Sequence, residues 1–229
     1  MGCAVVLLPG LDGLGSQFAP LVEALSPDVP TVVVPYPDVP MDYEAHQRVA
    51  ASALPRDRDY VILGESFSGP VAVSLAAESP RGLLGCILCA SFLRSPHRLL
   101  ALVAPFLGLL PPQRVPSRFS DFLVMGRFAT PSLRQMQLDA RRNVSAATLV
   151  ARLKAVAHVN VSDTLRGLTL PTLYLRASED RLVPRGAGEH FAALARSGRV
   201  VDIEGPHFLL QAKPVEAAAA IREFLTGLA

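Results

Sequence analysis

One serine lies where an apolar run, a tight turn and a helical pattern meet. Residues 60–69 read YVILGESFSG, with Ser66 at the centre of the turn. A serine on such a strand–turn–helix junction can act as a nucleophile, and the turn needs small residues two positions before and after it because backbone segments approach closely there. Gly64 meets this need, whereas Ser68 stands where glycine is usual. We interpret Ser66 as the candidate nucleophile.

A histidine that could activate this serine lies near the end of the chain. His207 occupies a loop between an apolar run at 199–203 and a helical pattern. The other four histidines lie in expected helices or in a long inserted segment. His207 alone follows a sheet strand late in the chain, so it is the candidate general base.

Two neighbouring carboxylates could orient that histidine. Glu179 and Asp180 lie just past an apolar run at 171–176, at the end of a strand where α/β sheets gather functional groups. We favour Asp180 because apolar residues and a proline follow it; Glu179 is the alternative, and either could instead cap the next helix. The order Ser66, Asp180, His207 is the nucleophile–acid–base order of one well-known α/β enzyme fold.

A glycine-rich loop follows the first apolar run. Residues 7–16 read LLPGLDGLGS. Acyl transfer requires backbone N–H groups directed to where the carbonyl oxygen becomes an anion, and the N–H groups of Leu11 and Phe67 would be these donors. A phosphate-binding loop is the alternative, but the glycine spacing fits neither the dinucleotide fingerprint nor a Walker loop.

The segments around these residues alternate between strand and helix patterns. This alternation is typical of βαβ units and predicts an α/β fold with a mainly parallel sheet of about six strands flanked by helices. We expect strands at 3–8, 31–35, 60–64, 84–90, 171–176 and 199–203, and helices near 17–25, 43–54, 67–78, 186–196 and 213–227.

Residues 93–168 interrupt the alternation, with several amphipathic helical stretches and no convincing strand. A structureless loop of that length is improbable in a compact domain, so we predict an inserted helical lid, with 1–92 and 169–229 as the α/β core. The first part of the insertion is almost wholly apolar. It could line a substrate pocket through Leu102 and Phe106, or it could pack on the body of the fold.

The composition narrows the range of partners. The chain has 229 residues, of which 50% are hydrophobic and 18% are charged, with 22 basic against 20 acidic residues. This excludes a disordered chain and supplies no electrostatic footprint for nucleic acid. No apolar run reaches the roughly 18 residues of a membrane span, so we expect no stable membrane insertion. The start of the chain lacks the basic leader of a signal peptide, so a cytoplasmic location is the default, and the oligomeric state is open.

Two of the three cysteines have the spacing of a redox or zinc motif. Cys86 and Cys89 lie in an expected strand, where residues three apart face opposite sides of the sheet and cannot share a metal. We expect buried, inert thiols. No cluster of His, Asp and Cys has ligand spacing, so neither a metal nor another cofactor is expected.

At these residues the sequence resembles the α/β-hydrolase superfamily over essentially its whole length. Residues 9–15 and 64–69 resemble a group of esterase/lipase-like hydrolases from bacteria and plants that carry a P-G-x-D-G-T-G oxyanion loop, with Leu14 where threonine is usual. Many relatives begin this loop with His-Gly. The resemblance also implies that the usual first two strands are missing, since Met1 stands directly before the strand that leads into the loop.

The resemblance implies a catalytic triad of Ser66, Asp180 and His207 and an oxyanion hole from Leu11 and Phe67. It implies a serine hydrolase that acts through an acyl-enzyme, and we interpret the protein as a carboxylesterase-type enzyme for small-molecule esters. The apolar start of the insertion and the nearly neutral chain predict acyl groups of short to medium length. Thioesterases and acyltransferases share that acyl-enzyme, so they are alternatives. The alternative from another class is a hydrolase-fold ligand-binding or signalling protein, against which the intact triad argues.

Overall fold

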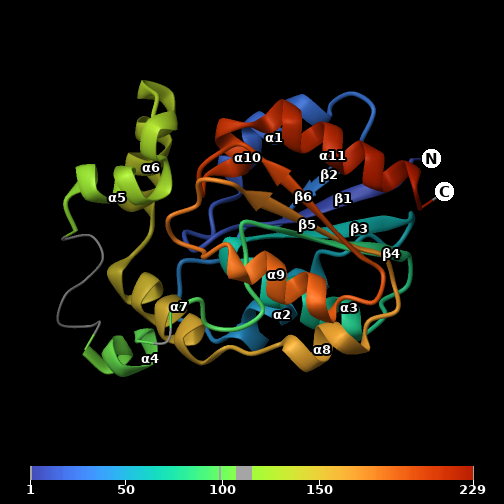
Figure 1. The fold of residues 1–229 in the computed structure, drawn as a ribbon, viewed down its shortest axis with the longest axis horizontal. Coiled ribbons are helices and arrows are strands. Elements are labelled where there is room, and N and C mark those ends of the chain that lie inside the picture. Colours follow the sequence, from blue (N-terminus) through green and yellow to red (C-terminus); the bar gives the residue numbers. More distant parts are fainter. Residues whose placement is uncertain (1, 98, 107–114, 229) are drawn as a thin grey trace.

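Six parallel strands form the centre of the computed structural model, which describes residues 2–97, 99–106 and 115–228. The strands lie in the order β2-β1-β3-β4-β5-β6 and all run in the same direction, so their carboxyl ends meet at one edge of the sheet (Figure 1). Their bounds are β1 (Ala4–Leu8), β2 (Thr31–Val33), β3 (Tyr60–Glu65), β4 (Leu83–Cys89), β5 (Thr172–Ala177) and β6 (Gly198–Ile203). The predicted α/β fold class is confirmed.

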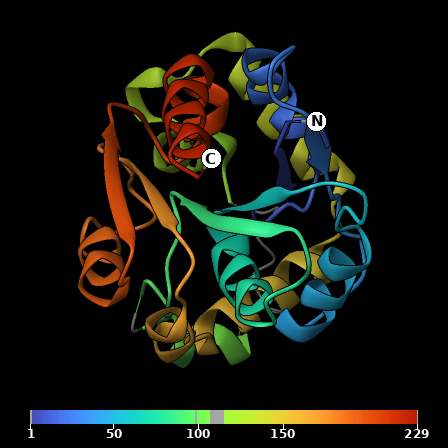
Figure 2. The same ribbon diagram turned by 90° about the vertical axis from the view of Figure 1, so that its right-hand side faces the viewer.

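Helices cover both faces of this sheet (Figure 2), as a parallel sheet requires because both of its faces are apolar. One face carries α1 (Ala19–Leu25), α10 (Leu209–Ala212) and α11 (Pro214–Thr226). The other carries α2 (Tyr43–Ser52), α3 (Gly69–Ala77), α8 (Ser162–Gly167) and α9 (Gly186–Leu194). Alternate residues of each strand therefore enter two separate cores.

Strand β1 illustrates this division. Val5 and Leu7 pack in the core under α1 and α11, whereas Val6 and Leu8 pack in the core under α3, and all four are fully buried. Burial of a side chain of this size stabilises the folded state by about 1.5–3 kcal/mol. A shift that moved one of these side chains out of its core would therefore be costly. Strand β4 follows the same rule: Cys89 lies in the first core and Cys86 in the second, and both thiols are free. The predicted opposite orientation of these cysteines is confirmed.

The connection from β4 to β5 is mainly helical in its described part. Its elements are α4 (Leu100–Val103), η3 (Ala104–Phe106), α5 (Ser117–Val124), η5 (Gly126–Phe128), α6 (Pro131–Asn143), α7 (Ala146–His158) and α8. Helices α4 to α7 lie beyond the carboxyl edge of the sheet (Figure 1), whereas α8 packs against α3 and α9. An isolated antiparallel bridge pairs Arg94 with Asn160.

The two longest helices of this connection begin at side-chain caps. The Thr130 hydroxyl accepts from the Leu133 N–H before α6, and the Ser145 hydroxyl accepts from the Thr148 N–H before α7. Each cap satisfies one of the N–H groups that a helix start leaves unpaired. Among the described residues, no helix is both long enough and apolar enough to cross a membrane.

Candidate active site

Ser66 lies on a strained turn between β3 and α3, in the 3-10 turn η2 (Ser66–Ser68). Its φ of 47° is in the left-handed region, which costs a non-glycine residue about 1–3 kcal/mol and is typical of functional sites. The turn brings Gly64 against the next segment, since a Cβ at Gly64 would lie 2.3 Å from the carbonyl oxygen of Ser68. The need for glycine two positions before the serine is therefore a matter of space.

Ser68, which stands where glycine is usual, is fully buried. Its hydroxyl donates to the carbonyl oxygen of Pro9 and lies 2.8 Å from the hydroxyl oxygen of Tyr36. The extra side chain is therefore accommodated because both neighbours supply hydrogen-bond partners. These contacts also tie the turn to the glycine-rich loop.

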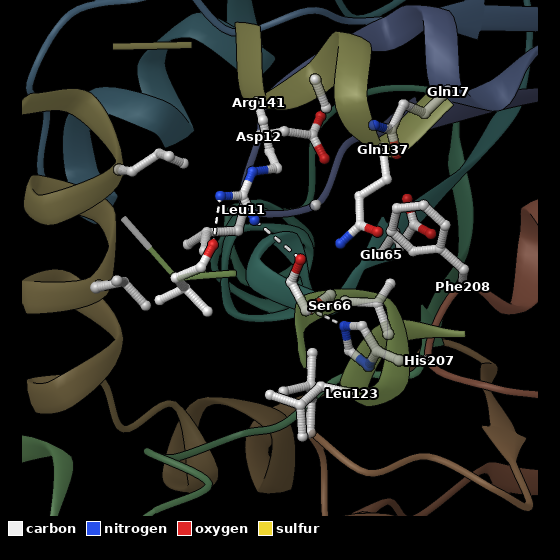
Figure 3. A pocket seen from close by; sticks show the side chains of 18 residues that line it. Leu11, Asp12, Gln17, Glu65, Ser66, Leu123, Gln137, Arg141, His207 and Phe208 are labelled. Atoms are coloured by element: carbon white, nitrogen blue, oxygen red, sulfur yellow. Dashed lines mark hydrogen bonds between the residues drawn. The ribbon is translucent and has the colours of Figure 1, made fainter. Parts of the chain in front are cut away.

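The structure brings Ser66, His207 and Asp180 together from the ends of three strands. Ser66 Oγ lies 2.9 Å from His207 Nε2 (Figure 3), and His207 Nδ1 lies 2.8 Å from Asp180 Oδ2. The other carboxylate oxygen of Asp180 accepts the N–H groups of Leu182 and Val183, each at 2.8 Å. The backbone of the loop after β5 thus holds Asp180 in one orientation towards the imidazole.

Glu179, the alternative acid, points to another partner. Its Oε1 accepts from Arg127 Nε at 2.9 Å, and Arg127 also pairs with Glu204. Arg127 lowers the pKa of Glu179. The structure therefore places Asp180, and not Glu179, against the histidine.

The electrostatic environment of His207 favours a charged imidazole despite its burial. Burial disfavours the charged ring, but attraction and a hydrogen bond from Asp180, together with the charge of Glu65, raise the pKa of His207 above its ordinary value. Because the protonated form of the imidazole is stabilised, the neutral ring accepts a proton from a neighbouring hydroxyl more readily.

Ser66 and His207 open into a cavity of about 360 Å³ (Figure 3). Leu11 lines it beside Ser66, and a Cβ at Gly10 would lie 3.9 Å from Ser66 Cβ, so the glycine-rich loop passes next to the serine. Phe67 is buried behind Ser66, stacked on Tyr43 with ring centroids 4.7 Å apart. The apolar wall comes from α5, α7 and the loop after β5, through Leu123, Val124, Leu149, Leu153 and Leu182.

Leu102 and Phe106 do not line this cavity. They lie on α4 and η3, and they are 70% and 64% exposed. The segment that contains them is apolar nearly all round, so its sequence does not indicate which side faces a pocket. The apolar lining that we expected from this first helix comes instead from the later helices of the insertion.

Arg152, which was not among the predicted site residues, joins the insertion to the glycine-rich loop. This side chain of α7 is fully buried and donates to the carbonyl oxygens of Leu11 at 2.9 Å and Pro37 at 3.1 Å, and to His46 Nε2 at 3.2 Å. A Cβ at Gly13 would lie 2.6 Å from its guanidinium nitrogen, which is why a glycine with φ of 75° stands there. An arginine in an amphipathic helix normally signals a solvent face, so no local pattern marks this one.

Polar residues that were not predicted to belong to the site also line the cavity. Asp12, Gln17, Glu65 and Gln137 line one side of it. Burial, opposed by a hydrogen bond from Gln211, raises the pKa of Glu65 to about 7. Two of these polar residues had a sequence signal: Glu65 stands next to the candidate nucleophile, and Asp12 stands in the P-G-x-D-G loop. Among the described residues, no group of three or more His, Cys, Asp or Glu side chains is placed to hold a metal ion.

The fold and this arrangement define the class of protein. A parallel α/β sheet that carries a serine on a strained strand–helix turn, with a histidine and an acid from later loops, is the architecture of α/β hydrolases. Residues 24–205 match the family model described as serine aminopeptidase, S33 (Hydrolase_4). The chain belongs to this family of α/β hydrolases.

Similar proteins of known name agree with this assignment. A pimeloyl-[acyl-carrier protein] methyl ester esterase of Xylella fastidiosa (strain 9a5c) is 30% identical over 250 residues, which cover 99% of this chain and 96% of that protein. Another protein of that name, from Vibrio parahaemolyticus serotype O3:K6, is 28% identical, with 97% and 94% covered. The relatives therefore support an enzyme of the esterase and hydrolase family.

Solved structures share the fold at low sequence identity. A bromoperoxidase from Bacillus anthracis has a TM-score of 0.86 at 16% identity, and an enol-lactonase from Burkholderia xenovorans LB400 has a TM-score of 0.84 at 17% identity. Each match covers 99% of this chain and 92% of the other. Their different activities show that the scaffold alone does not select a substrate.

Proposed function

We propose that this protein is a serine hydrolase that cleaves carboxylic esters of short to medium acyl chains through an acyl-enzyme on Ser66. One observation carries the proposal: Ser66 Oγ, both ring nitrogens of His207 and the carboxylate of Asp180 are joined by hydrogen bonds of 2.9 Å and 2.8 Å at the edge of an apolar cavity. The relatives named as methyl ester esterases support esters as the substrate class.

In the proposed mechanism, His207 Nε2 takes the proton of Ser66 as the hydroxyl attacks the ester carbonyl. Asp180 holds the imidazole in the required tautomer and balances its charge. The N–H groups of Leu11 and Phe67 donate to the oxygen of the tetrahedral intermediate. His207 then protonates the departing alcohol, and a water molecule releases the acid from Ser66 by the same steps in reverse order.

We also propose that the insertion at 93–168 acts as a lid on this site. Helices α5 and α7 supply most of the apolar wall of the cavity, and Arg152 ties α7 to the loop that carries Leu11. The acyl chain would lie against Leu149 and Leu153. A lid of this kind excludes water from the reacting centre and limits the length of the acyl group.

A chain-length series of acyl esters tests both proposals together. We expect kcat/KM to rise about fourfold for each methylene that the cavity buries, and then to fall when the cavity of about 360 Å³ is full. Replacement of Leu153 with phenylalanine should move the optimum to shorter chains because it fills part of the wall. The measurement is steady-state hydrolysis of methyl and p-nitrophenyl esters, with thioesters of equal length in parallel.

Phe106→Ala is the matched control of this series, since Phe106 is exposed and lies outside the cavity lining. It should leave the optimum unchanged. Absence of turnover with every ester would contradict the proposed function, and a preference for thioesters would transfer it to thioester hydrolysis. A flat length profile would contradict the lid.

The pH profile gives a second test, because His207 must be neutral to accept the proton of Ser66. Asp180 and Glu65 outweigh the effect of burial and raise the pKa of His207, so the acid limb of kcat/KM should lie above the ordinary histidine pKa of about 6.5. Glu65→Gln removes one negative charge that stabilises the imidazolium. The pKa of His207 should then fall, and the variant should keep its activity to lower pH than the wild type.

The comparison is made on kcat/KM measured between about pH 5 and pH 9. Glu179→Gln removes a charge that pairs with Arg127 and not with the histidine. The acid limb of the kcat/KM profile should therefore stay at the same pH. A limb that moves to higher pH in Glu65→Gln would contradict the assigned electrostatic role of Glu65.

A further inference from the structure

One side of the cavity is polar, in contrast to the apolar wall opposite. Gln17 from η1 (Gly15–Phe18), Glu65 from the end of β3 and Gln137 from α6 converge there (Figure 3), beside Asp12 of the glycine-rich loop. The three are only 4%, 6% and 8% exposed. Three segments far apart in the sequence thus place buried hydrogen-bonding side chains next to Ser66.

Two of these side chains have unused hydrogen-bonding atoms. Gln17 Nε2 and Gln137 Oε1 are buried and have no hydrogen-bond partner in the described part of the chain. A buried amide normally finds a partner because an unpaired donor or acceptor is costly. One unpaired donor and one unpaired acceptor on residues that line the same cavity are therefore suited to a ligand that supplies both partners.

The carboxyl groups nearby disfavour a negatively charged ligand. Glu65 Oε1 accepts from Gln211 Nε2 at 2.9 Å. A Cβ at Gly10 would lie 3.9 Å from Glu65 Oε2 and 4.0 Å from Asp12 Oδ2, so two acids approach the same point. Burial raises the pKa of both, that of Glu65 to about 7, yet near neutral pH Glu65 still carries its negative charge in a substantial fraction of the molecules. A carboxylate ligand would be repelled by these acids.

A cationic ligand is disfavoured on other grounds. Arg141 of α6 lines the same cavity, where its guanidinium donates to the hydroxyl of Ser120 at 2.9 Å and to the carbonyl oxygen of Val115 at 2.6 Å. Its permanent charge repels an ammonium group. With acids on one side and a guanidinium on the other, a neutral polar ligand is the best match.

We propose that Gln17, Gln137 and Glu65 form a subsite for a neutral substrate group that both accepts and donates hydrogen bonds, with a carboxamide as the best fit. The carbonyl oxygen of the carboxamide accepts from Gln17 Nε2, and its N–H donates to Gln137 Oε1. The inference rests on the proposed ester hydrolysis and narrows its substrate class to esters that carry such a group within the reach of the cavity.

Binding to the Ser66→Ala protein tests the subsite without turnover. Four methyl esters of equal chain length are compared by calorimetry, with chains that end in a carboxamide, a methyl group, a carboxylate or an ammonium group. We expect the carboxamide ester to bind about tenfold more tightly than the methyl-ended ester. This first comparison needs no change in the subsite, so it does not depend on the folding of a further variant.

Gln137→Leu, added to Ser66→Ala, should abolish the preference for the carboxamide. Gln135→Leu is the matched control, since Gln135 lies exposed on the same helix and bonds Asp139 at 2.8 Å, and it should keep the preference. Thermal unfolding of each variant verifies that it is folded. If Gln137→Leu does not fold, Gln17→Leu in η1 removes the other amide of the subsite and replaces it in the test.

Equal binding of the carboxamide and methyl-ended esters would overturn the subsite. Tightest binding of the carboxylate or the ammonium ester would also overturn it, because Arg141 or the two acids would then be the selecting groups. If the wild type hydrolyses no ester while the carboxamide preference in binding holds, the subsite stands and the proposed function fails. Hydrolysis with no carboxamide preference in binding leaves the function standing and the subsite overturned.

Discussion

Replacement of Ser66 with alanine should lower ester hydrolysis by roughly four to six orders of magnitude, since removal of a nucleophile that acts as a unit with its base abolishes the acyl-enzyme route. The loss should appear in kcat, with little change in substrate binding, because Ser66 Oγ contacts His207 and the cavity walls are untouched. The methyl group of alanine fits the strained turn as well as the serine side chain does.

Covalent labelling provides the measurement that separates this effect from unfolding. A fluorophosphonate should add one label to each wild-type chain and none to Ser66→Ala. Ser68→Ala is the control, because Ser68 lies in the same turn but bonds Pro9 and Tyr36 instead of His207, and it should keep the label. Normal labelling and turnover of Ser66→Ala would refute the assignment of the nucleophile.

The sheet could be predicted because its strands are buried on both faces and so appear as short apolar runs. The prediction is least accurate at β2, which was expected at 31–35 and ends at Val33. Pro9 explains the difference, because after Val34 N–H bonds the Leu7 carbonyl oxygen the next bond of the ladder would need an N–H at residue 9, and proline has none. The last expected helix, at 213–227, matches α11, but sequence alone did not reveal α10 before it.

The serine, histidine and acid were also predictable, because each follows a strand and the carboxyl ends of parallel strands meet at one edge. The cavity walls were not. Helical periodicity shows which residues share a face, but the face that Leu153 or Gln137 presents to the cavity depends on how the insertion packs. Arg152 is the extreme case, a charged residue whose partners include two backbone carbonyl groups that lie 141 and 115 residues away in the sequence.

The choice between Asp180 and Glu179 was decided by packing that the sequence does not contain. Both residues leave β5 side by side, and both were candidates. The N–H groups of Leu182 and Val183 turn Asp180 towards His207, whereas Arg127 from the insertion captures Glu179. The two acids therefore have different environments, and a pair of isosteric substitutions can distinguish them.

Asp180→Asn should leave the fold intact and lower turnover by about 10⁴-fold. The asparagine carbonyl oxygen can still accept the N–H groups of Leu182 and Val183, which places its NH₂ against His207 Nδ1. That nitrogen must then accept instead of donate, so the proton of the neutral ring moves to Nε2. A protonated Nε2 facing Ser66 cannot take the serine proton, and the loss should therefore appear in kcat at unchanged stability.

Glu179→Gln is the matched control, since it makes the same change of one oxygen to nitrogen at the adjacent residue. It weakens an exposed ion pair with Arg127, which contributes little to stability because solvent screens it, and leaves His207 untouched. Its turnover should stay within a few-fold of the wild type when both variants are compared by steady-state kinetics and thermal unfolding. A large loss in Glu179→Gln with a small one in Asp180→Asn would assign the acid to Glu179, and two small losses would show that neither carboxylate sets the tautomer of His207.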